Sequence, residues 1–324
     1  MINSLFRVLF PVFLLFLFSL PAIEQDVTSK TNASTCEPSS QKQVWLRVES
    51  QDDYRFVENL RLEDLAVTTD KLPAEAFRLE LKQDQSLAVV ILLDTSTSQQ
   101  YSLPQTKLAG QKFVEWILKT KKDRAALVSF SGTATVEEDL TNDLPKIRTA
   151  IGRIHTDRPA DYGVAGRTPP ITPQRQGTSA IWDAVWATTE GILQSAGDSR
   201  RVIVLLTDGE DSSSSTTLRQ TIEYAAGQDV AVFSIGITDT GYFRFGRNDL
   251  TDLSTDTGGR AFFPKKIQDL PDILQKIEQE VRATYLLNYC PAKSLSSSGK
   301  LQIEITNPQL RKAKVRLLYR RYVL

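Results

Sequence analysis

The fold follows from one stretch of the sequence, which reads Val89-Val90-Ile91-Leu92-Leu93-Asp94-Thr95-Ser96-Thr97-Ser98. Its aliphatic and β-branched beginning predicts a strand that is buried on both faces, as strands of parallel sheets are. Ligands of open α/β sheets bind beyond the carboxyl ends of the strands, and Asp94, Ser96 and Ser98 stand at that end of this run. One carboxylate and two hydroxyls suit a hard divalent cation, so the stretch predicts both a sheet and a metal site.

The composition is that of a globular protein and excludes several classes of function. Of the 324 residues, 41% are hydrophobic and 24% are charged, which is enough to form a sizeable core. The 39 basic residues balance the 39 acidic ones, so no overall field favours nucleic acid as a partner. The single histidine, His155, excludes most histidine-based catalysis and most zinc sites.

The N-terminal segment has the features of a secretory signal. Residues 1–22 contain a basic residue, Arg7, an apolar run over residues 8–20, and a small residue at Ala22. They predict a protein that is secreted, periplasmic or held at the cell surface. An uncleaved N-terminal anchor is the only expected link to a membrane, although the run is short for a membrane span. Residues 23–43 are mostly polar and predict a disordered linker.

The chain has two cysteines, Cys36 and Cys290. A disulfide between them fits an oxidising compartment, and two unpaired thiols are the alternative. Because Cys36 lies in the polar linker and can reach many places, the sequence does not decide between the two.

Apolar runs alternate with helical patterns through the middle of the chain. Residues 202–206 form a second apolar run, which ends close to Asp208, and residues 230–236 form a third. This alternation predicts a domain over residues 87–284. Its expected fold is α/β, with a doubly wound, mostly parallel, Rossmann-like sheet and helices on both faces.

Two helices of this domain have clear apolar faces. A helix from Pro104 to about Lys121 is expected to bury one side that includes Leu108. The last helix carries one apolar stripe at helical spacing, formed by Ile267, Leu270, Ile273, Leu274, Ile277 and Val281. That stripe predicts core packing and not a cofactor site. Between the helices, residues 155–176 form a loop rich in proline and charge that is expected to line the metal face.

Alternating strands flank the α/β domain on both sides. Residues 44–49 alternate strictly and predict a half-exposed strand within an N-terminal β segment over residues 44–86. A C-terminal β segment over residues 285–324 contains the basic run 311–321. The alternation of this run predicts a strand with one solvent-exposed, lysine-rich face. Because the ends of a domain often lie close together, the two segments are expected to build one small β module.

Five oxygen-bearing residues are expected to converge if the two acid-terminated strands are neighbours: Asp94, Ser96, Ser98, Thr178 and Asp208. They resemble the metal-ion-dependent adhesion site of the von Willebrand factor A family, which combines Asp-x-Ser-x-Ser, a separate Thr and a separate Asp. Gly177-Thr178-Ser179 and Thr207-Asp208-Gly209 match the second and third pieces in order. The flanking residues 59–67 and 285–291 are similar to a bacterial secreted, acidobacterial-type group related to this family. Thr97 departs from the family, which often has glycine at this place.

The resemblance implies how such a site works. Hydroxyls of Ser96, Ser98 and, in one state, Thr178 would bind Mg²⁺ or Mn²⁺ directly, with Asp94 and Asp208 acting partly through water. An ion with few directly bound carboxylates stays electron-poor and takes a further oxygen from a partner. The resemblance thus implies a non-catalytic, metal-dependent adhesion module that grasps an Asp or Glu side chain of a protein ligand. The alternative for single residues is the capping of free N–H groups at helix starts and turns.

Two other functions stay open on the sequence alone. One is a structural scaffold in envelope assembly, with an inactive metal site. The other is a metal-dependent phosphohydrolase that uses Asp94 as its nucleophile, although Ser96 stands where that chemistry needs a second acid. A serine hydrolase is excluded, because the sequence has no Gly-x-Ser-x-Gly elbow. It also has no phosphate-binding glycine loop.

Overall fold

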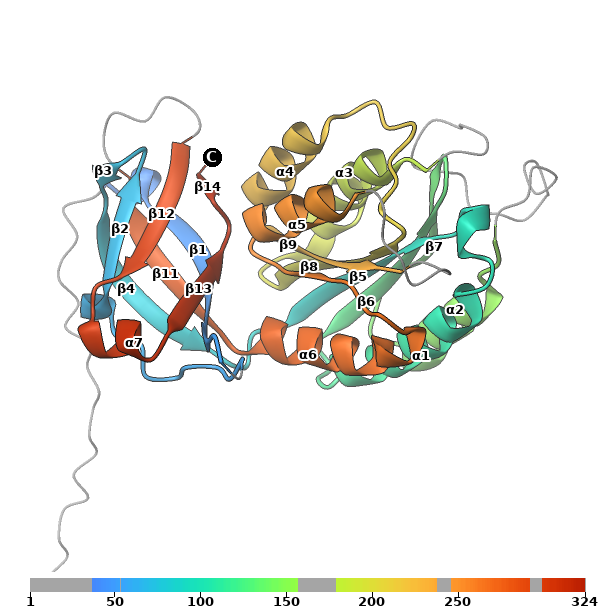
Figure 1. The fold of residues 1–324 in the computed structure, drawn as a ribbon, viewed down its shortest axis with the longest axis horizontal. Coiled ribbons are helices and arrows are strands. Elements are labelled where there is room, and N and C mark those ends of the chain that lie inside the picture. The colour runs from blue at the N-terminus through green and yellow to red at the C-terminus, as the bar shows by residue number, and fades with distance from the viewer. Residues whose placement is uncertain (1–36, 53, 157–178, 238–245, 292–298, 324) are drawn as a thin grey trace, which may run out of the picture. The chain divides into compact units, whose positions relative to one another are not determined.

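The computed structural model describes residues 37–323, apart from residues 53, 157–178, 238–245 and 292–298. Within these residues the chain forms an α/β domain and a β module (Figure 1). The predicted signal and most of the predicted linker lie outside the described residues. In the described part of the chain, no helix is long and apolar enough to cross a membrane.

The α/β domain is organised around a six-stranded sheet with the order β10-β9-β8-β5-β6-β7. Its strands are β5 (Leu87–Asp94), β6 (Arg124–Phe130), β7 (Ala134–Thr141), β8 (Arg200–Thr207), β9 (Val230–Gly236) and β10 (Ala261–Phe262). All neighbours pair in parallel except β7, which runs antiparallel to β6. Every residue of β5 and β9 is buried, as their unbroken apolar runs predict. The predicted fold class is confirmed.

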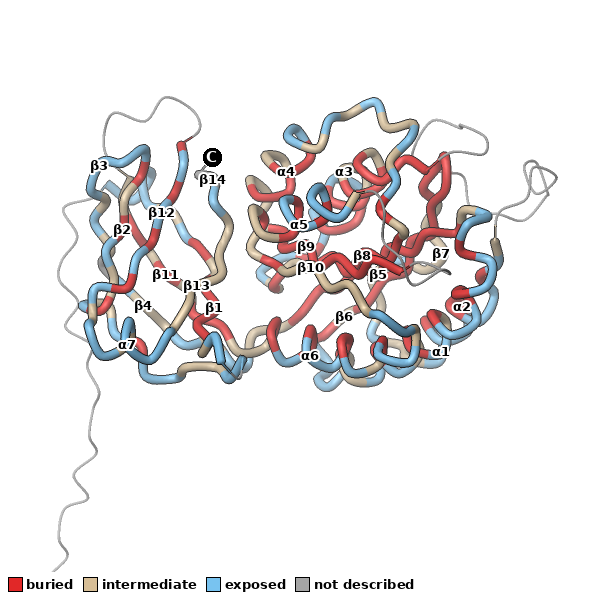
Figure 2. The backbone as a smooth tube through the Cα atoms, viewed as in Figure 1, coloured by how far each residue is buried: buried red, intermediate tan, exposed pale blue. Residues whose placement is uncertain are grey.

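Helices cover both faces of this sheet (Figure 1 and Figure 2). The helices α1 (Leu103–Ile117), α2 (Leu144–Arg153) and α6 (Leu270–Arg282) pack with the odd-numbered residues of β5. The helices α3 (Ile181–Gly191), α4 (Leu218–Gly227) and α5 (Arg247–Asp256) pack with its even-numbered residues. This division follows from the period of two with which side chains alternate along a strand.

One residue expected in the core is exposed. Helix α1 ends at Ile117 and not near Lys121, and Leu108 is 64% exposed. On the helix, Leu108 lies on the opposite side from Val114 and Ile117, both of which are fully buried. The buried side of the helix is therefore narrower than expected, and Leu108 lies outside it.

The β module consists of two antiparallel sheets, ordered β13-β1-β11-β4 and β14-β12-β2-β3. The first sheet contains β1 (Lys42–Ser50), β4 (Glu75–Lys82), β11 (Thr284–Cys290) and β13 (Val315–Tyr319). The second contains β2 (Leu65–Thr69), β3 (Leu72–Pro73), β12 (Gly299–Ile305) and β14 (Tyr322–Val323). Each sheet combines strands from both ends of the chain, which confirms the predicted composite module.

The C-terminal basic run is not a single strand. Its first residues belong to α7 (Pro308–Lys312), and only residues from Val315 onward are extended. The side chain of Asn307 caps this helix by accepting a hydrogen bond from the backbone N–H of Gln309. The remaining elements are the 3-10 helices η1 (Pro38–Ser40), η2 (Leu62–Asp64), η3 (Thr97–Gln99), η5 (Leu193–Ala196) and η6 (Ile267–Asp269).

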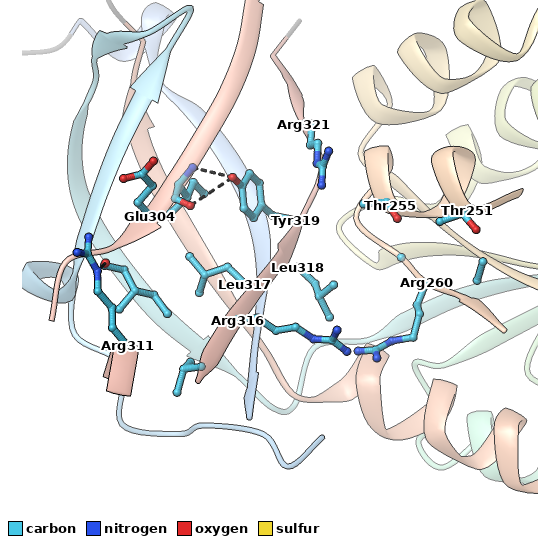
Figure 3. A pocket seen from close by; sticks show the side chains of 15 residues that line it. Thr251, Thr255, Arg260, Glu304, Arg311, Arg316, Leu317, Leu318, Tyr319 and Arg321 are labelled. Atoms are coloured by element: carbon cyan, nitrogen blue, oxygen red, sulfur yellow. Dashed lines mark hydrogen bonds between the residues drawn. The ribbon is translucent and has the colours of Figure 1, made fainter. Parts of the chain in front are cut away.

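A buried glutamate joins the β module to the α/β domain. Glu49 of β1 is fully buried and lies 2.6 Å from Arg260, which precedes β10, and 2.5 Å from Arg316 of β13. Figure 3 shows these two arginines pointing toward one another beside a cleft of about 660 Å³. Burial raises the pKa of the Glu49 carboxyl, but hydrogen bonds and charges from both arginines outweigh burial and hold the pKa below its usual value. The strict alternation of β1 predicts an exposed Glu49, and this pairing explains why the residue is buried instead.

A second buried acid ties the two ends of the α/β domain together. Asp123 Oδ1 accepts a hydrogen bond of 3.0 Å from the backbone N–H of Leu87, the first residue of β5. Its Oδ2 lies 3.0 Å from Arg282 Nη2, at the end of α6. The entry strand and the exit helix of the domain are thus held by one fully buried carboxylate.

The structure describes one of the two cysteines. Cys290, the last residue of β11, is disulfide-bonded. Cys36 lies outside the described residues. A disulfide at Cys290 is typical of a protein that folds in an oxidising compartment.

Candidate metal centre

Two neighbouring strands bring four of the predicted ligands to one edge of the sheet. Strand β5 ends at Asp94, and it pairs in parallel with β8 so that Leu93 lies opposite Leu206. Asp208 follows β8 directly, just as Ser96 and Ser98 follow β5. Because parallel neighbours end at the same edge, the two acid-bearing turns lie side by side.

The side-chain oxygens of these turns form a continuous hydrogen-bonded row. Ser96 Oγ lies 2.9 Å from Ser98 Oγ. Ser98 Oγ in turn donates to Asp208 Oδ2 at 2.5 Å. Ser98 is exposed and Asp208 is half-buried, so the row is open to solvent on one side. The structure therefore brings Ser96, Ser98 and Asp208 together.

Asp94 lies beneath this row and is almost completely buried, with 1% of its surface exposed. Its Oδ1 accepts a hydrogen bond of 2.9 Å from the backbone N–H of Ser96. Its Oδ2 accepts bonds from the hydroxyls of Thr207, at 2.6 Å, and of Ser179, at 3.4 Å. One carboxylate oxygen thus holds the loop that carries the serines, and the other holds the end of β8 and Ser179.

The charge of Asp94 is unfavourable in the absence of a cation. Burial and the nearby negative charge of Asp208 raise the pKa of the Asp94 carboxyl to about 6, against hydrogen bonds from Ser96 and Thr207 that lower it. A bound cation favours the ionised form of a buried carboxylate such as that of Asp94. This electrostatic arrangement fits a divalent metal ion at the site.

Thr178, the fifth predicted ligand, lies outside the described residues, as does almost all of the loop expected to line the metal face. Its neighbour Ser179 is described and contacts Asp94 as stated above. The backbone N–H of Ser179 also donates to Ser212 Oγ at 3.0 Å, which links it to the loop after β8. The role of Thr178 stays a prediction.

The loop after β8 also fixes the start of α3. Asp211 Oδ1 accepts bonds from the backbone N–H groups of Ile181, at 2.7 Å, and Trp182, at 3.4 Å. Ser214 Oγ accepts from Trp182 N at 3.0 Å. These groups satisfy N–H donors that a helix start leaves free. Sequence reasoning missed Asp211, because this cap lies about thirty residues from the helix it serves and follows no local rule.

A close backbone contact supports the turn that carries Asp208. Gly209 and Gly246 both have a positive φ, of 84° and 72°. A Cβ atom at Gly246 would lie 1.8 Å from the carbonyl oxygen of Gly209, so only glycine fits there. Gly246 begins α5, and the packing of this helix start therefore fixes the turn beside the site.

Thr97 fits the loop without strain. It is the first residue of η3, its side chain is exposed, and its φ is not among the positive values of the described residues. A glycine is required only where φ is positive or where another atom comes close. The departure of Thr97 from the family pattern therefore leaves the geometry of Ser96 and Ser98 intact.

The donor set determines which metal would fit. The described residues contain no group of three or more His, Cys, Asp or Glu that could hold a metal ion. A cation at this edge would therefore depend on the serine hydroxyls together with Asp94 and Asp208. Neutral hydroxyls and carboxylates are hard oxygen ligands, which suit Mg²⁺ or Mn²⁺.

Comparison with known proteins identifies the family. A model of the von Willebrand factor type A domain matches residues 88–276, which is more than half of the chain. The chain belongs to the von Willebrand factor type A domain family. The finer resemblance to an acidobacterial-type group stays a prediction. No curated protein gives a significant match to the sequence.

Solved structures are similar to this chain at low sequence identity. A von Willebrand factor type A protein from Catenulispora acidiphila is 13% identical, with a TM-score of 0.50, over 72% of this chain and 70% of that chain. An aerotolerance-related membrane protein from Bacteroides fragilis is 17% identical, with a TM-score of 0.45, over 60% of this chain and 98% of that chain. Proximal thread matrix protein 1 from the mussel byssus, with a zinc-occupied MIDAS motif, is 15% identical, with a TM-score of 0.46, over 63% of this chain and 50% of that chain.

Proposed function

We propose that the protein is a non-catalytic, extracytoplasmic binding module that holds Mg²⁺ or Mn²⁺ and through it binds an Asp or Glu carboxylate of a protein ligand. The proposed ligands of the ion are Asp94, Ser96, Ser98, Thr178 and Asp208. The observation that supports this most directly is the row of oxygens from Ser96 through Ser98 to Asp208 above the buried Asp94.

The chemistry of this row favours capture of a carboxylate. Hydroxyl ligands carry no charge, and both oxygens of Asp94 already accept hydrogen bonds, from the Ser96 backbone N–H and the Thr207 hydroxyl. A divalent ion held mainly by hydroxyls keeps much of its positive charge, and Mg²⁺ keeps positions for exchangeable oxygens. A carboxylate from a partner supplies such an oxygen with a compensating charge.

The burial of Asp94 argues against the phosphohydrolase alternative. A nucleophilic carboxylate must reach its substrate, whereas Asp94 is 1% exposed and both of its oxygens accept hydrogen bonds. The scaffold alternative keeps the same fold without metal-dependent binding. An experiment on the metal therefore separates the scaffold from the binding module.

An extracytoplasmic location is proposed from two independent features. Residues 1–22 have the composition of a secretory signal. Cys290 is disulfide-bonded, and stable disulfides are rare in reducing compartments.

Replacing Asp208 with alanine is expected to weaken Mg²⁺ binding by at least about 100-fold while leaving the circular dichroism spectrum unchanged. The carboxylate is lost from the metal row, but Asp208 lies in a turn at the surface, so the core is unaffected. Titration calorimetry measures the binding. Glu210→Ala is the matched control, because Glu210 is an exposed acid of the same turn. An unchanged Mg²⁺ isotherm in Asp208→Ala would refute the site.

The binding function itself is tested with the native envelope as the source of ligand. The purified protein is immobilised and exposed to envelope extract in Mg²⁺ or in EDTA. We expect the wild type and Glu210→Ala to retain ligand proteins in Mg²⁺ but not in EDTA. Asp208→Ala is expected to retain them in neither condition. Equal retention in EDTA would favour the scaffold.

A further inference from the structure

A buried arginine without a partner lies at the opposite end of the strand that leads to the metal edge. Arg200 is the first residue of β8 and is 3% exposed. Its Nε and Nη1 atoms have no hydrogen-bond partner among the described residues. Its guanidinium carbon lies 5.3 Å from the ring centroid of Trp45. A buried charge without a counter-charge costs several kcal/mol in most proteins, so such a group calls for compensation.

Arg200 lines a small chamber between β8 and β1. The chamber has a volume of about 10 Å³, which is room for one particle of about the size of water. Its walls come from both parts of the protein: Trp45, Arg200, Arg201, Asp229, Ala231, Thr257, Gly258 and Arg320. Burial lowers the pKa of the Arg200 guanidinium to about 10, against the negative charge of Asp229, which raises it, and the positive charge of Arg47 lowers it further.

The charges that face this chamber do not balance. Asp229 is its one acidic wall residue and lies 3.2 Å from Arg320 Nη1. Arg201 donates to the carbonyl oxygens of Gln228, at 2.9 Å, and Gly197, at 3.3 Å, so it has no counter-charge there. The Nε atoms of Arg201 and Arg320 are also buried without a partner. Outside the wall, Glu280 acts on Arg200 at a distance, but it is paired with Arg260.

A larger cavity shares part of these walls. It measures about 300 Å³ and has Trp45, Arg201 and Asp229 in common with the chamber. Its lining carries two acids, Asp198 and Asp229, beside the bases Lys82 and Arg201, so positive charge is not in excess there. The excess of positive charge belongs to the chamber itself, which three arginines line together with one acid.

We propose that this chamber binds one small monovalent anion of the size of chloride, held by the unpartnered N–H groups of Arg200 with those of Arg201 and Arg320. A halide ion accepts several hydrogen bonds at once and fits a chamber with room for one small particle. Since Trp45 belongs to β1 and Arg200 to β8, the bound anion stabilises the contact between the β module and the α/β domain.

Unfolding in two sodium salts tests the anion site. The full protein is unfolded by urea in EDTA, in increasing chloride or in gluconate at matched ionic strength. Above the dissociation constant, the apparent unfolding equilibrium constant is expected to fall about tenfold for each tenfold rise in chloride, as for one anion that binds only the folded state. Gluconate is too large for the chamber and should not have this effect.

Arg200→Gln is expected to lose the difference between the salts. Arg148→Gln removes the same charge from an exposed pair with Glu115 and should keep the difference. Should Arg200→Gln fail to fold, crystals of the wild type grown in bromide decide the question by anomalous diffraction. A bromide peak at Arg200 is expected. An equal response to both salts, retention of the difference in Arg200→Gln, or a water molecule in place of bromide would overturn the proposal.

Discussion

Replacing Asp94 with asparagine is expected to make the metal-free protein more stable at pH 8 by about 1–3 kcal/mol, and at the same time to abolish Mg²⁺ binding. The pKa of the buried Asp94 carboxyl is raised to about 6 from an ordinary value of 3.8. The neutral form is therefore favoured by the fold, and ionisation at higher pH costs stability. Asparagine stays neutral but loses one acceptor that the hydroxyl of Thr207 uses, so the gain is smaller than the pKa alone implies.

The sign of this effect gives a specific pH profile. Because the folded pKa is above the unfolded one, the stability contributed by Asp94 is fully present below about pH 4 and is lost as the pH rises through about 6. Urea unfolding in EDTA between pH 4 and pH 8 should show this loss in the wild type and not in Asp94→Asn. In Mg²⁺ the order reverses, since only the wild type gains from the metal. A variant that is less stable than the wild type in EDTA at pH 8 would contradict the argument.

Replacing Gly246 with alanine is expected to destabilise the protein by about 2–5 kcal/mol and to weaken Mg²⁺ binding by about 10- to 100-fold. The new Cβ atom would lie 1.8 Å from the carbonyl oxygen of Gly209, and the φ of 72° is strained for alanine. Relief of this contact must move the turn that holds Asp208. Thermal unfolding and titration calorimetry measure the two effects.

Gly191 supplies the matched control. It ends α3, and an added Cβ atom there would meet nothing within 4 Å. Gly191→Ala should raise stability by about 0.5–1 kcal/mol and leave metal binding unchanged. Wild-type metal affinity in Gly246→Ala would show that the contact with Gly209 does not position Asp208.

The strand-and-acid pattern was sufficient to predict which side chains meet at this edge of the sheet, whereas their binding of a metal stays a prediction. Two unbroken apolar runs that each end in an acid predicted buried parallel strands, and parallel neighbours place their carboxyl ends together. Asp94, Ser96, Ser98 and Asp208 are accordingly brought to one edge. The segments on either side of the α/β domain alternate between apolar and polar residues, which predicted the strands of the β module. This alternation can be recognised in the local sequence alone.

The residues that support this edge could not be predicted in the same way. Asp211 caps α3, and Gly246 packs on Gly209, through contacts between distant loops. Glu49 is buried because arginines from two other elements surround it, which the alternation of its own strand does not reveal. One missed feature did have a local signal, since Asn307 followed by Pro308 marks a helix start just before the basic run.

The bond network of Asp123 lowers the entropy cost of joining the two ends of the chain in the β module. Strands β4 and β11 pair Lys82 with Thr284, so the whole α/β domain is the loop between them. Closing a loop of about 200 residues in an unfolded chain costs on the order of 5 kcal/mol of entropy. In the folded α/β domain, Asp123 holds Leu87 beside Arg282. The pairing of the β strands then requires no further loss of loop entropy. The folded α/β domain therefore holds the two ends of the chain close together for the pairing of β4 with β11.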